Sequence, residues 1–315
     1  MADSSKPSGT DDPAYPDRVD SVRLVEVGPR DGLQNEAVEL STNDKIGLIT
    51  RLIDAGIGRI EAVSFAHPKR VPQMADAEEV MAALPIPSGA NLIGLVMNWK
   101  GWQRAVATEV DEVNIPVFAT ETFNERNQGA PIAETVAQLA DVVAAAGERG
   151  VAVTGTVSAA WGCPFEGEVT VDQVVGLAEA VVGTGVGELA LADTIGVADP
   201  WSVERLLEAV GSVVGGVPLR VHFHDTRNTG LANVHAAVQN GVGTVDAAAG
   251  GIGGCPFAPS ATGNIATEDL VYMLHRAGFA TGVDLAALLD VSAWLEEKLG
   301  HPVPSMLLKA GTWPT

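Results

Sequence analysis

His222 and His224 stand one residue apart, at the end of an apolar run and before a polar segment. The apolar run predicts a β-strand, and on a strand the residues i and i+2 face the same side. The two imidazoles would then project together from the C-terminal end of that strand. This geometry suits two ligands of one metal ion, although short motifs are weak signals and a hydrogen-bonded pair of structural histidines is the alternative.

Asp31 and Arg30 are the next candidates, directly after the first predicted strand. With the two histidines, Asp31 makes an oxygen-and-nitrogen donor set that favours Mg²⁺, Mn²⁺ or Zn²⁺. Arg30 beside such an ion would hold and neutralise an oxyanion. Two plainer interpretations stay open: Asp31 as a turn residue before Gly32, and Arg30 as half of a surface salt bridge.

Two acidic residues and one cysteine complete the set that could do chemistry. Glu61, on the second predicted strand, and Asp193, at the end of the sixth, could orient ligands or move protons. They could equally be structural hydrogen-bond acceptors. Cys255 follows four glycines within residues 250–254, and such a loop can close as a lid and deliver a thiol as acid or nucleophile. A flexible connector is the alternative, and Cys163 is interpreted as a packing residue.

Alternating strands and helices must position these side chains. Apolar or β-branched runs predict strands at 22–27, 59–64, 91–97, 112–118, 151–157, 188–192, 218–223 and 244–248. Capped segments between them predict helices at 42–55, 72–83, 132–146, 171–182, 200–210 and 231–239, with two more at 267–276 and 285–299.

This alternation predicts parallel pairing in a closed (β/α)₈ barrel with additional C-terminal helices, whose chemistry lies at the C-terminal ends of the strands. A doubly wound open sheet is the alternative, but no Gly-x-Gly-x-x-Gly motif follows the first strand. We expect residues 21–315 to form one domain after a disordered tail at 1–20, which is rich in Asp, Ser, Pro and Gly.

Composition narrows the range of partners and compartments. With a formal net charge of −21 and only 19 Lys and Arg, the chain lacks a basic surface for nucleic acid or an anionic membrane. An anionic substrate must therefore meet a local positive site. The two cysteines lie far apart, which suits a reducing compartment. With no apolar run near the ~18 residues of a membrane span and no recognisable targeting segment, we expect a cytoplasmic protein.

Six ordered blocks resemble the 3-hydroxy-3-methylglutaryl-CoA lyase family. They lie at 25–36, 64–74, 162–167, 193–196, 222–226 and 253–258 followed by 263–270, and the similarity extends from residue 22 to about 299. The resemblance implies a metal-dependent barrel related to isopropylmalate and homocitrate synthases. It implies cleavage of a 3-hydroxy-3-methylglutaryl thioester to acetyl-CoA and acetoacetate.

The resemblance also implies roles for individual residues. Carried over by position, the ligands of a divalent cation, Mg²⁺ or Mn²⁺, are Asp31, His222, His224 and Asn264. Arg30 would bind substrate, together with Gln34 of the same block. Cys255 would handle the proton of the acetyl-CoA enolate, and Glu61 and Asp193 match acidic residues of the family's site. Barrels of this kind are often homodimers, for which the helix at 285–299 is a candidate contact.

Three positions depart from the family's usual pattern. Residues 227–229 read Arg-Asn-Thr, residues 247–249 are three alanines where serines are usual, and Ala192 precedes Asp193 where glycine is common. These positions flank the site, so a lyase for a related branched 3-hydroxyacyl-CoA is one alternative. A Claisen-type synthase joining acetyl-CoA to a 2-keto acid is another, disfavoured by the short C-terminal region. A catalytically silent scaffold is the third, disfavoured because all four ligand positions are filled.

Overall fold

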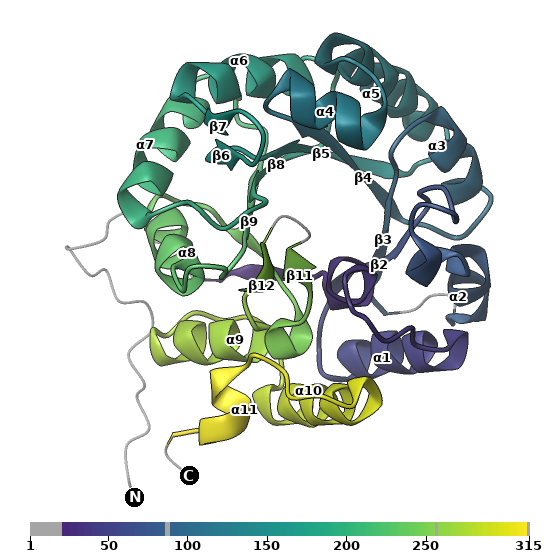
Figure 1. Ribbon diagram of the computed structural model, residues 1–315, viewed down its shortest axis with the longest axis vertical. Helices are drawn as coiled ribbons and strands as arrows, with labels where there is room; N and C mark the ends of the chain where they lie inside the picture. Colours follow the sequence, from purple (N-terminus) through teal and green to yellow (C-terminus); the bar gives the residue numbers. More distant parts are fainter. Residues whose placement is uncertain (1–20, 86–88, 256–257, 314–315) are drawn as a thin grey trace, which may run out of the picture.

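Eight parallel strands close into a barrel, with helices around it (Figure 1). The computed structural model describes residues 21–85, 89–255 and 258–313, so the predicted tail at 1–20 lies outside the described residues. Around the barrel the strand order is β1-β10-β9-β8-β5-β4-β3-β2, and β1 closes it by pairing with both β10 and β2. The predicted (β/α)₈ barrel is thereby confirmed.

The barrel strands agree with the predicted ones to within two residues at either end. They are β1 (Arg23–Glu26), β2 (Arg59–Ser64), β3 (Asn91–Leu95), β4 (Glu112–Phe118), β5 (Ala152–Ser158), β8 (Glu188–Asp193), β9 (Leu219–Phe223) and β10 (Thr244–Ala247). Most of these strand residues are buried, because helices cover the barrel from outside while side chains fill it from inside.

The helices surround this barrel in chain order. They are α1 (Thr42–Asp54), α2 (Ala77–Ala83), α3 (Trp99–Ala105), α4 (Glu121–Gln128), α5 (Ile132–Gly147), α6 (Val171–Val182), α7 (Pro200–Gly211), α8 (Gly230–Gln239), α9 (Thr267–Arg276), α10 (Leu285–Leu299) and α11 (Met306–Ala310). The predicted additional C-terminal helices are present, and α10 packs beside α1 (Figure 1). None of the helices in the described part of the chain is long and apolar enough to cross a bilayer.

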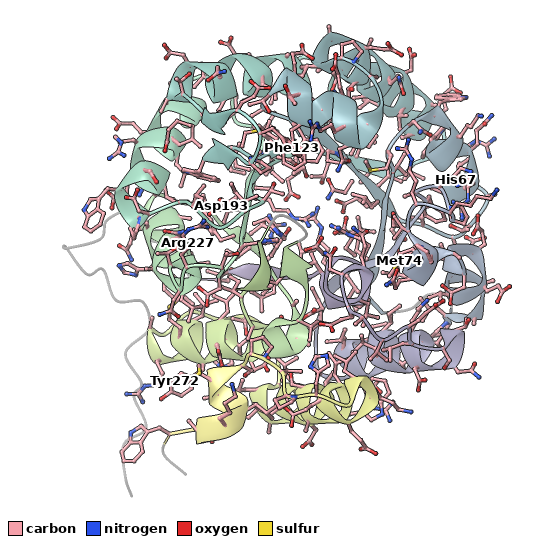
Figure 2. All side chains as sticks on the ribbon, viewed as in Figure 1. His67, Met74, Phe123, Asp193, Arg227 and Tyr272 are labelled. Atoms are coloured by element: carbon pink, nitrogen blue, oxygen red, sulfur yellow. The ribbon has the colours of Figure 1, made fainter. Side chains whose placement is uncertain are left out.

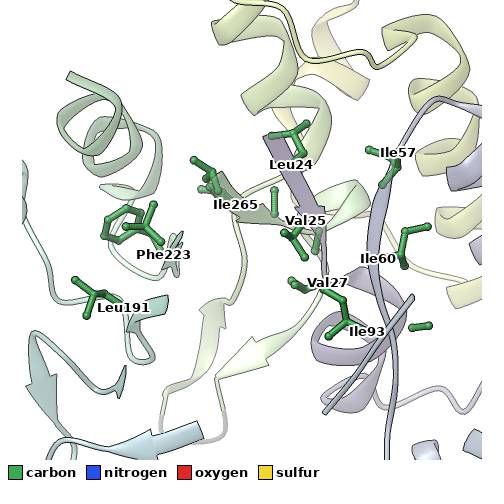
Figure 3. Packing of buried hydrophobic residues seen from close by; sticks show 14 of the residues in the cluster. Leu24, Val25, Val27, Ile57, Ile60, Ile93, Leu191, Phe223 and Ile265 are labelled. Atoms are coloured by element: carbon green, nitrogen blue, oxygen red, sulfur yellow. The ribbon is translucent and has the colours of Figure 1, made fainter. Parts of the chain in front are cut away.

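Apolar side chains on both faces of the strands form the main core. Leu191 and Phe223 lie on neighbouring strands, and Val25, Ile60 and Ile93 fill the region around β1 to β3 (Figure 3). All five are fully buried. Burying an aliphatic or aromatic side chain of this size stabilises a fold by about 1.5–3 kcal/mol, so this layer fixes the strands whose ends carry the polar residues.

The prediction of one continuous helix at 72–83 is wrong. Residues 72–83 form a short 3₁₀ turn, η2 (Pro72–Met74), and then α2, with a break at Asp76. The Asp76 carboxylate accepts hydrogen bonds from Lys45 Nζ at 2.7 Å and Thr42 Oγ1 at 2.8 Å. These contacts tie the break to α1, which a one-dimensional pattern does not show.

Several short elements escaped the sequence prediction. They are α3, α4 and α11, a π-helical turn η1 (Gly28–Gly32), a 3₁₀ turn η3 (Ala249–Gly251), and two small hairpins, β6 (Gly162–Cys163) with β7 (Gly167–Glu168) and β11 (Gly254–Cys255) with β12 (Ala258–Thr262). Two of them, η1 and the β11–β12 hairpin, carry residues of the site described next.

Candidate active site

The turn η1 places Arg30 and Asp31 at the C-terminal end of β1. The backbone N–H groups of Arg30, Asp31 and Gly32 all donate to the Val27 carbonyl, at 3.2, 2.7 and 3.2 Å. Gly28 is required by packing, since a Cβ there would lie 2.5 Å from Oε1 of Glu26. The turn is therefore built tightly against the barrel, and it aims two adjacent polar side chains toward the barrel axis.

Asp31, His222 and His224 converge, as the sequence predicted. One ligand atom from each lies within 4.8 Å of the others. Oδ2 of Asp31 is 3.7 Å from Nε2 of His224, and the two imidazole centroids are 5.0 Å apart. Both histidines are buried, and the adjacent rings confirm that positions 222 and 224 share one face of β9 and its continuation.

Asn264 joins this cluster from the far end of the chain. Its Nδ2 donates to Oδ2 of Asp31 and to the Ile252 carbonyl, both at 3.1 Å. The backbone pairs with His224 in an isolated antiparallel bridge. The close approach between the segments at Gly253 and Asn264 depends on two glycines. A Cβ on Gly253 would lie 2.8 Å from Nδ2 of Asn264, and one on Gly263 would lie 2.0 Å from the Gly253 carbonyl oxygen.

Arg30 is buried and not in a surface salt bridge. Its Nε and Nη2 donate to Oε2 of Glu61 at 3.0 and 2.5 Å, and its Nη1 donates to Oδ1 of Asp31 at 2.6 Å. Glu61 is fully buried, and its Oε1 accepts from Asn114, whose own side-chain oxygen accepts from Thr156. Charge-assisted bonds of this kind fix the guanidinium plane, so Arg30 is held rigidly beside the cluster.

Neighbouring charges lower the pKa of Asp31 and raise the pKa of His222. Burial alone would raise the pKa of the Asp31 carboxyl, but Arg30 and the two histidines hold that pKa well below its usual range. Burial would lower the pKa of His222, but the hydrogen bond and negative charge of Asp246 raise it overall. The Asp31 carboxylate is thus ionised at any pH near neutral.

The residues fit a divalent cation. One carboxylate oxygen, two imidazole nitrogens and an amide oxygen are donors that Mg²⁺, Mn²⁺ and Zn²⁺ accept. Among the described residues, Oδ1 of Asn264 is buried without a hydrogen-bond partner. Buried polar atoms are almost always paired, so an unpaired acceptor oxygen on the side chain whose Nδ2 binds Asp31 is an observation that a bound cation would account for.

Asp193 ends β8 and is not one of the three clustered residues; it lies on the same side of the barrel as Arg227 (Figure 2). Its carboxylate is fully buried and accepts from the backbone N–H groups of Val197 and Ala198, at 3.0 and 2.9 Å. Burial raises its pKa, while these two bonds and the nearby histidines lower it in part. The residue braces the loop after β8, at the end of the barrel where the cluster also lies.

Gln34 and Cys255 are less fully placed. Gln34 follows η1, half-buried, and its Oε1 has no hydrogen-bond partner among the described residues. The backbone of Cys255 pairs with Ala258 in the β11–β12 hairpin, and a Cβ on Gly253, at the base of this hairpin, would lie 3.3 Å from the Asp31 carbonyl oxygen. The Cys255 side chain lies outside the part of the chain that is described. Cys163 is buried and its sulfur accepts from Thr120 Oγ1 at 3.0 Å, in agreement with a packing role.

Sequence reasoning missed the residues behind the cluster. Asp246 on β10 lies 3.1 Å from Nδ1 of His222, and Arg220 on β9 forks onto Asp246. A signal was available, because Arg220 is two residues before His222 and must share its face of the strand. Asn114, which donates to Glu61 and accepts from Thr156, carried no comparable signal.

The chain matches proteins of known family over most of its length. The model of the HMGL-like family matches residues 21–295. The chain belongs to the HMGL-like family. It is a carbon–carbon lyase of the type represented by hydroxymethylglutaryl-CoA lyase, as the sequence resemblance predicted.

Three similar proteins show how close the likeness is. The hydroxymethylglutaryl-CoA lyase of Bacillus subtilis is 41% identical over 295 residues, which are 94% of this chain and 98% of that one. An (R)-citramalyl-CoA lyase of Chloroflexus aurantiacus is also 41% identical, covering 93% of this chain and 96% of its own. The structure of an HMG-CoA lyase from Acinetobacter baumannii, in complex with coenzyme A and 3-methylmalate, superposes with a TM-score of 0.89 at 42% identity, over 94% and 96% of the two chains. Overall similarity to this HMGL-like chain does not separate the two kinds of substrate.

Proposed function

We propose that this protein cleaves 3-hydroxy-3-methylglutaryl-CoA to acetyl-CoA and acetoacetate in a metal-dependent retro-Claisen reaction. The observation that carries the proposal is the convergence of Asp31, His222 and His224 beside a buried Arg30. Support also comes from the family and from the hydroxymethylglutaryl-CoA lyases that the chain matches. Because the whole protein is strongly acidic, a thioester carrying phosphates and a carboxylate must find its positive charge locally, and Arg30 supplies it next to the cluster.

The reaction breaks the bond between the carbinol carbon and the carbon next to the thioester. A proton leaves the tertiary hydroxyl, that oxygen becomes the ketone of acetoacetate, and the bonding pair moves onto the thioester as an enolate. The enolate carbon then takes up a proton and gives acetyl-CoA. A divalent cation held by Asp31, His222, His224 and Asn264 would lower the pKa of the hydroxyl and orient it.

The chain's own residues supply the other tasks. Arg30 is fixed by Glu61 and Asp31, so its guanidinium is preorganised to stabilise the negative charge that develops on the thioester oxygen. Glu61 is committed to Arg30 and Asn114. Burial raises the pKa of Asp193, and we assign it the role of accepting the hydroxyl proton, since a carboxylate with a raised pKa is a stronger base.

Cys255 is assigned the last step. Its thiol would donate the proton that the enolate carbon takes up, and the β11–β12 hairpin would carry it over the barrel mouth. The base of that hairpin lies against Asp31 and Asn264, which is the position that a covering segment for this site must occupy. Excluding water there would keep bulk solvent from intercepting the enolate.

A related branched 3-hydroxyacyl-CoA is the second candidate substrate. The (R)-citramalyl-CoA lyase matches this chain as well as a hydroxymethylglutaryl-CoA lyase does. Alanines 247–249 are buried at the end of β10. Arg227 donates to the Ile195 and Gly196 carbonyls at 2.9 and 2.8 Å, in the loop after β8. These residues make the site's surroundings differ from the usual pattern of the family.

A substrate panel tests the proposal. Purified protein with Mn²⁺ would be given 3-hydroxy-3-methylglutaryl-CoA, citramalyl-CoA, and acetyl-CoA with each of several 2-keto acids. We expect the highest kcat/KM for 3-hydroxy-3-methylglutaryl-CoA. A higher kcat/KM for citramalyl-CoA would make citramalyl-CoA the preferred substrate. Condensation without cleavage would show a synthase and contradict the proposed cleavage.

Three expectations from the sequence stay proposals beside this one: a single domain over residues 21–315, a cytoplasmic location and a homodimer that uses α10. Light scattering tests the last. A mass of twice 32.5 kDa is expected, and a monomer mass at working concentration would exclude the dimer. Cell fractionation tests the location, and one cooperative unfolding transition is expected of a single domain.

A further inference from the structure

A line of ion pairs runs inside the barrel, on the side of the cluster that faces the N-terminal ends of the strands. Arg59 on β2 binds Glu112 and Glu188, with Nη2 at 2.6 Å from an oxygen of each. Nη1 of Arg220 lies 4.0 Å from the same oxygen of Glu188. Arg220 in turn binds Asp246, which reaches His222. Of the two arginines, only Arg220 touches a residue in contact with the metal cluster.

Arg220 holds both oxygens of one carboxylate. Its Nε donates to Oδ1 of Asp246 at 2.5 Å and its Nη2 donates to Oδ2 at 2.9 Å. This paired geometry fixes the plane of the carboxylate as well as its position. Arg220 is itself fully buried and Asp246 nearly so, so neither side chain can turn to solvent.

The fixed carboxylate orients His222. Oδ2 of Asp246 lies 3.1 Å from Nδ1 of His222, so the ring nitrogen that remains for a cation is Nε2. A carboxylate behind a metal-binding histidine sets the tautomer and the ring orientation, and loss of such a partner typically weakens metal binding by about 10–100-fold. Residues 220, 222 and 224 share one face at β9, so the brace and two ligands follow one another along one segment.

We propose that Arg220 is a positioning residue for the metal site: by clamping Asp246 it sets the orientation of His222 and thereby the affinity for a divalent cation. The inference rests on the proposed function in one respect, that Asp31, His222 and His224 bind the cation. It goes further because it gives a residue outside the cluster control over metal affinity.

The test compares two arginines in the same barrel. Mn²⁺ dissociation constants would be measured by electron paramagnetic resonance of the free ion, on wild-type protein, Arg220→Lys and Arg59→Lys. Lysine keeps the charge but cannot fork onto a carboxylate. We expect Arg220→Lys to weaken Mn²⁺ binding by at least about tenfold and Arg59→Lys to leave it within about twofold, because Arg59 binds Glu112 and Glu188 and not Asp246. Circular dichroism would show whether each variant is folded. If a lysine variant is not folded, Arg220→Gln and Arg59→Gln would be compared instead.

A double-mutant cycle shows whether Arg220 acts through Asp246. Asp246→Asn should weaken Mn²⁺ binding, and adding Arg220→Lys to it should cause little further loss. The inference would be overturned, and the proposed metal site would stand, if the two losses were additive. The same holds if a folded Arg220→Lys variant bound Mn²⁺ as tightly as wild type. A wild-type protein that does not bind Mn²⁺ would overturn the proposed metal site and this inference together.

Discussion

Nδ2 of Asn264 donates a hydrogen bond to Oδ2 of Asp31 at 3.1 Å, across 233 positions of sequence. The contact joins the turn after β1 to the segment that follows the β11–β12 hairpin. It leaves Oδ1 of Asn264 buried and without a partner in the described part of the chain. The site therefore combines a segment after the first barrel strand with a segment after the last one. Asn264, from the later segment, has a side-chain oxygen that is free to accept.

Removing this amide should weaken metal binding. We predict that Asn264→Ala raises the Mn²⁺ dissociation constant by about tenfold or more, in line with losses at residues that support metal sites. Asn91→Ala is the matched control, because Oδ1 of Asn91 is also buried without a partner among the described residues but lies at the N-terminal end of β3. Titration calorimetry measures both, and equal affinities for the two variants would remove Asn264 from the ligand set.

Arg30 should matter through its fork and not only through its charge. Arg30→Lys keeps the positive charge but loses the paired bonds to Glu61. We expect kcat on 3-hydroxy-3-methylglutaryl-CoA to fall by about 10²-fold, the typical cost of losing one preorganised donor to a developing negative charge.

The control for Arg30 lies on the outside of the barrel. Arg104 binds Glu78 through the same two nitrogens, Nε and Nη2, which donate to its two carboxylate oxygens at 2.6 and 2.8 Å. Arg104→Lys should keep the wild-type kcat. If Arg30→Lys also kept it, the guanidinium would have no role in stabilising the enolate.

Cys255 is predicted to act after the cation has bound. Cys255→Ser should bind Mn²⁺ as tightly as wild type and lose most of its turnover, because a serine hydroxyl is a much weaker acid than a thiol. Cys163→Ser is the control, since Cys163 is buried beside Thr120 and is assigned no step. Steady-state kinetics with an unchanged kcat for Cys255→Ser would exclude the thiol as the proton donor.

Glu26 makes stability depend on pH. Burial raises the pKa of this carboxyl to about 7, although hydrogen bonds from Thr267, Ala249 and Gly28 oppose the rise. The folded protein thus keeps a proton that the unfolded chain releases near pH 4.5. Stability contributed by the protonated group is present at low pH and is lost as pH rises toward about 7, by about 3 kcal/mol in all.

Glutamine at position 26 should remove that dependence. Its amide oxygen can still accept from the backbone N–H groups of Gly28 and Ala249, at 2.8 and 2.9 Å in wild type. We expect urea unfolding to show Glu26→Gln close to wild type at pH 5 and more stable at pH 8. Exposed Glu39→Gln should change neither value. The same effect of Glu26→Gln at both pH values would refute the assignment.

Much of the fold and part of the site follow from local sequence patterns. Parallel barrels repeat one strand-and-helix unit, so buried runs and capped helices predicted all eight strands and the closure. His222 and His224 were found because strand geometry alone makes positions i and i+2 neighbours. Asp31 could be added because strand ends in a barrel meet at one face.

The remaining parts depend on contacts between distant segments. Asn264 reached the ligand set only through family resemblance, since its position depends on the close approach of Gly253 and Gly263. The break at Asp76 arises from its bonds to α1. Asp246 and Arg220 were missed. Arg220 could have been found, because it lies two residues before His222 and therefore shares its face of the strand. A buried ion pair on neighbouring strands has no signature in either strand alone.

The most direct test of the account is acetyl-CoA release from 3-hydroxy-3-methylglutaryl-CoA, with Mn²⁺ or Mg²⁺ and again after chelation. We predict release at an ordinary enzymatic rate with the cation, abolition of release by the chelator, and recovery when the cation is returned. Release that persists undiminished after chelation would contradict the metal-dependent mechanism. No release from protein shown to bind the cation would contradict the proposed substrate.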